Sequence, residues 1–268
     1  MARESSDEKE EAMREQGVII QSVDRAIGII NLFTGPVAEL GITDIAGQME
    51  LSKSTAYGLV NTLTAAGYLE QNPESKRYRL GLKLFELGSL VRERMDLREI
   101  ARPYLKDLSA YFGMTVHMGL YRDWEMVYID KMDAPNQRII YSQVGKRAPM
   151  YCTGIGKAVL ANLNDKDIQY ILSVQPREAL TRNTKTESSQ IIEELAQIRQ
   201  QGYAVDYEEV EMGLRCVAVP VFDDGQRPVA AISISSSAAV LEQEKIQEAA
   251  GYLKKAAGGI SRRLGYYP

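Results

Sequence analysis

One stretch of the sequence, residues 52–80, leaves few folds open to the first third of the chain. Its apolar residues recur at i, i+3, i+4 and i+7, so a helix formed here buries one narrow face: Ala56, Leu59, Val60 and Leu63. The opposite face has only small or polar side chains: Lys53, Ser54, Thr55, Tyr57, Gly58, Asn61 and Thr62. After Gly67, residues 68–71 and 76–80 have the pattern of two strands around the turn 72–75. A helix of this kind followed by a hairpin is typical of a winged helix-turn-helix.

Two shorter helices are expected ahead of this stretch. Residues 22–33 have apolar side chains at helical spacing, and Thr34-Gly35-Pro36 ends that helix. Residues 43–49 have the same spacing over a shorter length, and Glu50-Leu51 forms a tight connection to the third helix. The expected N-caps of the three helices are Ser22, Thr43, and either Ser52 or Ser54. A generic three-helix packing unit would show the same periodicity, so the polar face of the third helix is what favours DNA binding.

The charge balance has to be reconciled with DNA binding, because the chain carries a net charge of −4. Within residues 17–80 the acidic residues slightly outnumber the five cations, which are Arg25, Lys53, Lys76, Arg77 and Arg79. Four of these five lie at the start of the third helix or on the hairpin, where phosphates would lie, and a phosphate responds to the field within ~10 Å. The residues expected to contact DNA are Lys53, Ser54, Thr55, Tyr57, Asn61, Lys76 and Arg77.

The remainder of the chain is expected to form a linker and a second domain. Residues 1–16 are hydrophilic without an apolar period, which predicts a disordered tail ahead of the winged helix-turn-helix domain at residues 17–80. The amphipathic segment 81–96 predicts a linker helix. Residues 97–268 mix helices with adjacent antiparallel strands, which indicates an α+β domain. Its expected helices are 97–112, 155–163, 167–174, 187–201 and 241–264, and its expected strands are 115–121, 126–131, 203–207, 215–222 and 228–235.

Cysteine and histidine are too few for several kinds of site. Cys152 and Cys216 lie far apart, so neither a disulfide framework nor a CxxC zinc site is expected. The one histidine, His117, sits in an alternating, strand-like run, which favours a packed side chain over a catalytic base. Gly154-Ile155-Gly156-Lys157 is not a P-loop, because Ala158 replaces the Ser or Thr of that motif. No apolar run approaches ~18 residues and no apolar signal region opens the chain, so we expect a cytoplasmic protein with no membrane partner.

Several motifs, taken in order, resemble the IclR family of bacterial transcriptional regulators over residues 20–265. They are QSVDRAIGII, LSKSTAYGLVNTL, GYLEQNP, RYRLGLKLFELGS, DLREIARPYL, VYIDKMD, YSQVGKRAPMYCTGIGKAVLA, QGYAVDYEE, EMGLRCVAVPVFD and PVAAISIS. KSTAY, RLGLKLFELG, YSQVGKRAPMY and SRRLGYY are most similar to the KdgR-type branch, which regulates sugar-acid catabolism. The resemblance implies an N-terminal winged helix-turn-helix, a linker helix and a C-terminal GAF/PAS-like effector-binding domain. It also implies binding to palindromic double-stranded operator DNA as a homodimer or a dimer of dimers.

One position departs from the family pattern. Family recognition helices place an arginine after the His or Tyr of K-S-T-x-[HY]-R, and this chain has Gly58 there. An arginine–guanine contact contributes roughly 1–3 kcal/mol of base discrimination, and a mid-helix glycine costs about 1 kcal/mol relative to alanine. Either Gly58 lets the backbone approach DNA more closely, or base readout has moved to Ser54, Thr55, Tyr57 and Asn61. In both cases we expect an operator that differs from those of the relatives.

The resemblance also implies where a small-molecule effector binds. The cavity would be lined by the start of the CTGIGKA helix, by the GLRC segment and by the ISIS strand, on which Ser233 and Ser235 share one face. The backbone amides of Gly154 and Ile155 would attract a carboxylate. The expected effector-binding residues are Ile140, Gly154, Ile155, Asp206, Leu214, Cys216, Ser233 and Ser235. No cofactor or metal is expected, and the expected ligand is a small organic acid, such as the keto-sugar acid 2-keto-3-deoxygluconate.

The leading hypothesis is a sequence-specific DNA-binding repressor whose operator affinity is controlled by a small carboxylate metabolite. A ligand-binding module with weakened DNA binding is an alternative, compatible with Gly58 and the acidic balance. A second alternative, an enzyme that uses Cys216 with Asp206, lacks a positioned base, so no catalytic residue is assigned. The effector residues also have plainer interpretations: solvated strand serines, a buried thiol acting as a small hydrophobe, and an aspartate that caps or pairs structurally.

Overall fold

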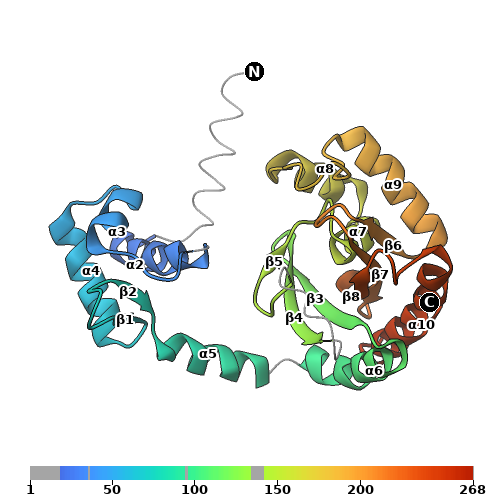
Figure 1. The fold of residues 1–268 in the computed structure, drawn as a ribbon, viewed down its shortest axis with the longest axis horizontal. Coiled ribbons are helices and arrows are strands. Elements are labelled where there is room, and N and C mark those ends of the chain that lie inside the picture. The colour runs from blue at the N-terminus through green and yellow to red at the C-terminus, as the bar shows by residue number, and fades with distance from the viewer. Residues whose placement is uncertain (1–18, 36, 94–95, 134–141, 268) are drawn as a thin grey trace. The chain divides into compact units, whose positions relative to one another are not determined.

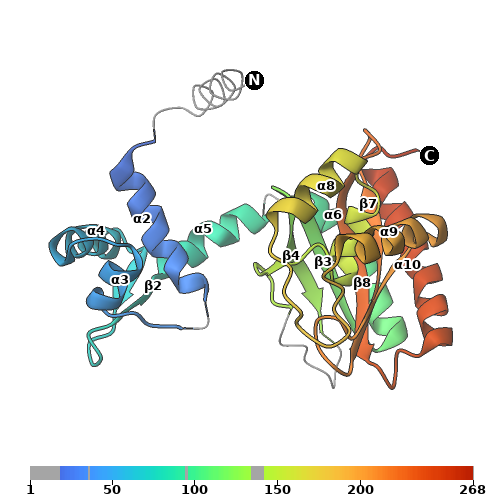
Figure 2. The same ribbon diagram turned by 90° about the horizontal axis from the view of Figure 1, so that it is seen from above.

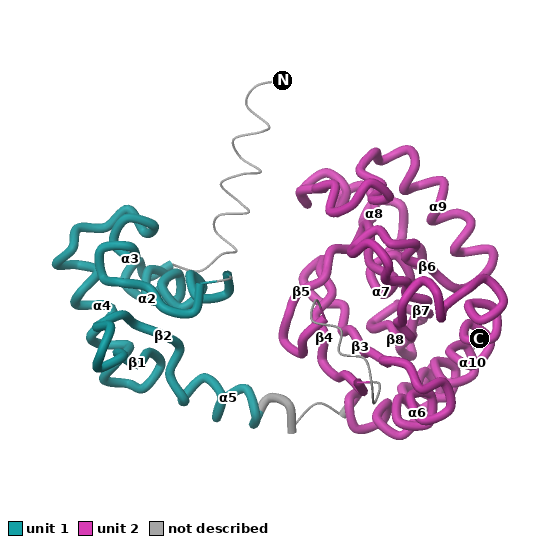
Figure 3. Tube along the Cα trace, in the orientation of Figure 1, with its two compact units in different colours: residues 1–94 teal, residues 95–268 magenta. Residues whose placement is uncertain are grey.

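The computed structural model describes residues 19–35, 37–93, 96–133 and 142–267. The chain forms two compact units, Met1–Arg94 and Met95–Pro268, which Figure 3 shows in different colours. The division falls inside the predicted linker 81–96. The predicted tail 1–16 and Ile140 lie outside the described residues. Each unit has its own buried core, so each is described by itself.

The N-terminal unit is a group of short helices followed by a hairpin (Figure 1). Its elements are α2 (Gln21–Asn31), the 3-10 helix η1 (Leu32–Thr34), α3 (Ile42–Gln48), α4 (Lys53–Ala65), β1 (Leu69–Gln71), β2 (Tyr78–Leu80) and α5 (Leu82–Glu93). Its core takes Ile29, Ile45 and Val60 from the three helices and Leu69 and Tyr78 from the hairpin. These packed elements confirm the winged helix-turn-helix that the sequence predicts.

The start of α4 agrees with the sequence, and the start of α2 does not. The hydroxyl oxygen of Ser52 accepts the N–H of Thr55 at 3.2 Å, so Ser52, one of the two predicted alternatives, is the N-cap. Ser22 is not a cap, because α2 already begins at Gln21 and no side chain caps it. The first backbone N–H groups of α2 therefore donate no hydrogen bond to a capping side chain.

Thr43 also lies inside its helix, because a strand contact decides where α3 begins. Leu40 and Tyr78 exchange backbone hydrogen bonds of 2.9 and 2.8 Å, which keeps the chain extended up to Gly41. The N–H of Gly41 then donates to the Asp44 carboxylate at 3.1 Å, as in one half of a capping box. The local sequence does not reveal the contact with the hairpin, so a local capping rule chooses the wrong residue.

The C-terminal unit is a six-stranded antiparallel sheet with helices on both faces (Figures 1 and 2). The sheet order is β5-β4-β3-β8-β7-β6, from β3 (Thr115–Arg122), β4 (Glu125–Met132), β5 (Arg147–Ala148), β6 (Ala204–Tyr207), β7 (Leu214–Phe222) and β8 (Pro228–Ser237). One face packs against α6 (Asp96–Phe112) and α10 (Gln243–Arg263), and the other against α7 (Gly154–Leu160), α8 (Asp165–Val174) and α9 (Ser188–Gln201). A separate buried cluster fills each side of the sheet, as the predicted α+β fold requires.

Two details of this sheet differ from the sequence-based expectation: the short edge strand β5 is not among the expected strands, and one hairpin turns at a different residue. The hairpin between β3 and β4 turns at Asp123 and Trp124, one residue later than predicted, and both residues have positive φ (52° and 67°), as tight two-residue hairpins require. Ser233 and Ser235 share a strand face, as predicted, and both are buried, which excludes the alternative of solvated strand serines. The reason is that α7 covers this face of β8.

The passage from β2 into α5 depends on a glycine. A Cβ on Gly81 would overlap the backbone carbonyl of Gly67, and backbone in a hairpin cannot shift freely. Gly81→Ala is expected to destabilise the N-terminal unit by about 1–3 kcal/mol, the usual cost of overpacking. Differential scanning calorimetry of the full chain would show this as a lower Tm for one transition. Gly88→Ala in α5, where a Cβ meets nothing within 4 Å, is the control, and equal Tm changes in both variants would contradict the prediction.

Candidate functional site

One face of α4 is buried and the other is open. Ala56, Val60 and Leu63 are buried, as predicted. The exposed face carries the helix residues that were predicted to contact DNA: Lys53, Ser54, Thr55, Tyr57 and Asn61. The Tyr57 side chain is 56% exposed, so its ring and hydroxyl are available to a partner. The α4 surface therefore presents hydrogen-bonding groups and one cation on a single side.

Ion pairs within the unit use two of the three cations on the hairpin. Arg77 Nη2 lies 2.7 Å from Asp44 Oδ2, and Arg79 Nη2 lies 3.2 Å from Glu70 Oε2. Arg77, predicted as a DNA contact, thus ties the hairpin to α3 while its side chain stays 46% exposed. Lys76 is exposed in the turn of the hairpin. Counting charges along the sequence misses the Arg77 pair, because its partner lies 33 residues earlier.

The C-terminal unit contains a small cavity between the sheet and the start of α7. Its volume is about 20 Å³, room for roughly one water molecule. The lining residues are His117, Tyr128, Ser142, Thr153, Gly154, Asp206, Val210, Leu214, Cys216 and Ser235. Most of them are buried, whereas Val210 and Leu214 are only half-buried and reach the surface. These two residues therefore form the mouth of the cavity.

Five of the residues predicted to bind an effector meet in this cavity: Gly154, Asp206, Leu214, Cys216 and Ser235. Ser233 is buried on the same strand as Ser235, but it does not line the cavity. Ile155 does not line it either, since its side chain packs against the sheet at Gly119. Consecutive residues of a helix point about 100° apart, so a helix that begins with Gly154 at the cavity turns Ile155 away from it.

Five lining residues were not predicted: His117, Tyr128, Ser142, Thr153 and Val210. His117 Nε2 lies 2.6 Å from Ser142 Oγ, and its Nδ1 lies 3.4 Å from Ser235 Oγ. Burial and the nearby Lys131 lower the pKa of His117 to about 3, so the ring is neutral, which agrees with the predicted packed histidine. His117 pairs with Ser233 across β3 and β8. The alternation of residues would have placed it on the serine face if that strand order had been known.

Burial controls the ionisation of the acidic groups at the cavity. Asp206 is buried, which raises the pKa of its carboxyl to about 7, although its Oδ1 accepts the N–H of Glu209 at 2.7 Å. Burial, together with Asp206, also raises the pKa of the Cys216 thiol to about 11. Cys216 therefore stays protonated near neutral pH, which agrees with its interpretation as lining rather than as a nucleophile.

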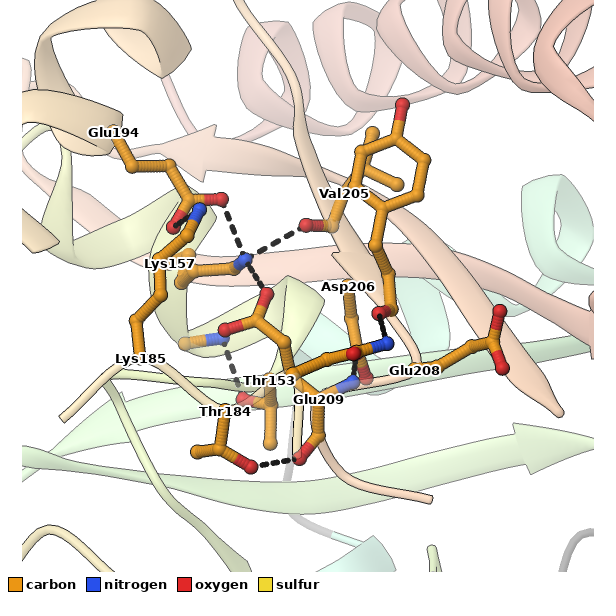
Figure 4. Close-up of polar contacts among 12 residues, drawn as sticks. Thr153, Lys157, Thr184, Lys185, Glu194, Val205, Asp206, Glu208 and Glu209 are labelled. Atoms are coloured by element: carbon orange, nitrogen blue, oxygen red, sulfur yellow. Dashed lines mark hydrogen bonds and ion pairs between the residues drawn. The ribbon is translucent and has the colours of Figure 1, made fainter. Parts of the chain in front are cut away.

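A buried lysine lies behind the cavity, on the helix whose first residue lines it (Figure 4). Lys157 Nζ donates to Glu194 Oε1 at 2.7 Å, to the carbonyl of Val205 at 2.7 Å, and to the Glu209 carboxylate. Lys185 pairs with the other oxygen of Glu194 at 3.1 Å. Burial opposes the charge of Lys157, but the two carboxylates outweigh it, so its pKa lies above the usual value. Once a P-loop is excluded, the sequence pattern gives this lysine no role, because its partners lie too far along the chain to be found by spacing.

Comparisons with known proteins agree with both units. The model of the IclR helix-turn-helix domain matches residues 22–73, and that of the bacterial transcriptional regulator IclR C-terminal domain matches residues 90–262. The chain belongs to the IclR family. It is accordingly a transcriptional regulator with a DNA-binding helix-turn-helix.

Individual relatives match nearly the whole chain. The transcriptional regulator XynR of Escherichia coli K12 is 41% identical over 92% of this chain and 98% of its own length. KdgR of the same organism is 38% identical over 92% of this chain and 94% of its own, which supports the KdgR-type branch. The crystal structure of the Thermotoga maritima IclR is 37% identical, has a TM-score of 0.72 and covers 91% of this chain and 99% of its own. Among the described residues, no helix is long and apolar enough to cross a membrane.

The Gly58 position is sterically free. A Cβ there meets nothing within 4 Å, so the protein itself does not require glycine. Gly58→Ala is expected to raise the stability of the N-terminal unit by about 0.5–1 kcal/mol, measured by calorimetry. If the α4 backbone approaches DNA closely, the same variant should bind the upstream DNA of its own gene more weakly.

Gly47→Ala in α3 is the matched control, since its Cβ also meets nothing within 4 Å and it lies outside the predicted contact face. Weaker DNA binding in Gly58→Ala but not in Gly47→Ala would support close approach. Unchanged DNA binding in Gly58→Ala would indicate that the bases are read by the side chains around Gly58 and not through a close approach of the backbone.

The raised pKa of Asp206 gives a pH prediction. The folded chain keeps the Asp206 proton up to about pH 7, whereas the unfolded chain releases it near pH 4, so the stability of the chain falls as the pH rises from about 4 to about 7. Asp206→Asn keeps an acceptor for Glu209 and removes that loss of stability. Its stability relative to the original chain should increase by about 2 kcal/mol between pH 5 and pH 8. Urea unfolding followed by the fluorescence of Trp124, the single tryptophan, measures this. If the free energy of unfolding of Asp206→Asn and that of the original chain change with pH in parallel, the prediction is wrong. Asp224→Asn, at an exposed position, is the control.

Proposed function

We propose that this regulator is a repressor whose operator affinity is lowered by a small organic acid bound in the cavity beside Asp206. In this proposal α4 and the hairpin β1–β2 contact a palindromic operator, and the chain acts as a homodimer or a dimer of dimers. Keto-sugar acids such as 2-keto-3-deoxygluconate are the expected class of effector, in keeping with the similarity to KdgR.

The observation that carries the proposal is the convergence of polar groups on one cavity in the unit that does not hold the helix-turn-helix. The lining of the cavity includes Ser142, Ser235 and Tyr128, each with a hydroxyl group, and Asp206 with a carboxyl group. The hydroxyl of Thr153 is already used, because it donates to the Pro149 carbonyl and accepts the N–H of Gly156. Ligand sites commonly combine an apolar wall with a few such placed polar groups. The wall here includes Val210 and Leu214.

The chemistry of the cavity suits an acid despite the lack of a lysine or arginine among its lining residues. The hydroxyl groups are hydrogen-bond donors, and the first amides of α7, at Gly154 and Ile155, have no partner within the helix. Because the pKa of Asp206 is about 7, its carboxyl group can stay protonated and donate a hydrogen bond to a bound carboxylate. Repulsion between two carboxylates is thereby avoided.

The second candidate function is a ligand-binding module with weakened DNA binding. It is favoured by the ion pairs of Arg77 and Arg79, which reduce the positive charge that the hairpin offers to phosphates. The high pKa of Cys216 counts against a cysteine-dependent enzyme.

Fluorescence anisotropy tests the proposal directly. The full chain is titrated onto labelled upstream DNA of its own gene over a salt series, with and without 2-keto-3-deoxygluconate and simpler keto acids. We expect salt-sensitive binding that one acid weakens by about 5- to 150-fold, the usual range of allosteric coupling. Binding that no acid changes would overturn the effector assignment, and no specific binding would favour the second candidate.

A single hydroxyl provides a sharper test of the site. Ser235→Ala removes a buried polar group of the cavity with little change in volume. Losing one hydrogen bond should weaken binding of the active acid about two- to tenfold, measured by isothermal titration calorimetry. Ser173→Ala on the exposed surface of α8 is the control. Equal acid affinity in both variants would place the ligand elsewhere.

A further inference from the structure

We propose that Glu209 is a positioning residue of the effector cavity: through its ion pair with Lys157 it holds residues 208–214, the mouth segment, in the closed position. The inference rests on the proposed function only in naming the cavity as the effector site. Opening and closing of the mouth can be measured without any effector.

The cavity has to open before any organic acid can enter. Its volume of about 20 Å³ suits one water molecule, and even the smallest keto acids are several times larger. Val210 and Leu214 are the two lining residues of the mouth segment, and both are half-buried while the deeper residues Asp206 and Ser235 are buried. The mouth segment therefore separates the polar groups of the cavity from solvent.

The backbone of Glu209 anchors the centre of the mouth segment. Its N–H donates to Asp206 Oδ1 at 2.7 Å, and its carbonyl accepts the hydroxyl of Thr184 at 2.6 Å. Thr181 donates to the carbonyl of Glu208 at 2.7 Å. Glu208 has a φ of +63°, a conformation that a glutamate adopts only when its surroundings impose it. The segment is held in place by these bonds rather than by its own preference.

The side chain of Glu209 provides the strongest of these anchors (Figure 4). Its carboxylate bonds to the fully buried ammonium of Lys157, on the same helix as the cavity residue Gly154. A buried ion pair breaks only at a high cost if either charge is left unpaired. Here Lys157 would keep Glu194 and the Val205 carbonyl when Glu209 leaves. Glu209 can therefore swing out with the mouth segment while the lysine remains paired.

A purely structural role for Lys157 and its partners Glu194 and Glu209 predicts a different result. If Lys157 only stabilised the fold, its two carboxylate partners would matter alike, and loss of either would loosen the whole unit. If Glu209 positions the mouth segment, its loss would open the cavity locally, whereas loss of Glu194 would not. The two cysteines of this unit distinguish these outcomes, because Cys216 lines the cavity and Cys152 is buried in the cluster beneath α7.

The test is the rate at which iodoacetamide alkylates each cysteine at pH 8 in the full chain, followed by peptide mass spectrometry. In Glu209→Gln, which is isosteric but uncharged, Cys216 should react about tenfold faster than in the original chain. Cys152 should accelerate far less, because it stays buried and loses only the charge of Glu209, which raises its pKa in the original chain. In Glu194→Gln the Cys216 rate should stay close to the original. Thr184→Val removes the hydrogen bond to the Glu209 carbonyl and leaves the buried charges in place, so it should also raise the alkylation rate of Cys216 alone. This variant tests the inference if Glu209→Gln does not fold.

Three results would overturn the inference: an unchanged Cys216 rate in Glu209→Gln and Thr184→Val, acceleration of Cys152 in step with Cys216, or equal effects of Glu209→Gln and Glu194→Gln. Addition of 2-keto-3-deoxygluconate to the original chain is a separate arm. Protection of Cys216 by the acid would support the proposed function, and absence of protection would count against that function without changing the result for the mouth segment.

Discussion

The C-terminal unit is organised around one buried ammonium group. Lys157 joins α7 to α9 through Glu194, to β6 through the Val205 carbonyl, and to the segment after β6 through Glu209. A fully buried charge is tolerated only when its hydrogen-bonding capacity is used. Lys157 therefore fixes the positions of α9, β6 and the segment after β6 relative to α7. The cavity lies directly in front of this cluster, and its shape depends on where the cluster holds the surrounding backbone.

The N-terminal unit depends on a comparable long-range contact, this time between backbone groups. The Leu40–Tyr78 bridge and the Arg77–Asp44 ion pair attach the hairpin to α3, the helix that precedes α4. The hairpin therefore stabilises the helix pair. The acidic residues of residues 17–80 slightly outnumber the cations, and two of them, Asp44 and Glu70, are ion-pair partners for cations of the hairpin.

The proposed function combines two kinds of surface with opposite physical demands. The α4 face has to stay solvated and hydrogen-bonding, and it is exposed from Lys53 to Asn61. The cavity has to exclude most water, so that a few polar contacts become stronger. Burial raises the pKa of Asp206 and lowers the pKa of His117, and both shifts favour the neutral form of the side chain.

The sequence by itself determined the periodic features: the buried stripe and polar face of α4, the hairpin, and the alternation of Ser233 and Ser235 with isoleucines. The family resemblance added half of the residues that line the cavity. Periodicity is a local property, because each residue's face follows from the helix or strand repeat. Only the tertiary structure decided what those faces meet. The start of α3, the place of His117 beside the serines, the direction of Ile155 and the partners of Arg77 and Lys157 all depend on contacts between distant segments. Such contacts are set by strand order and packing, which no local pattern contains.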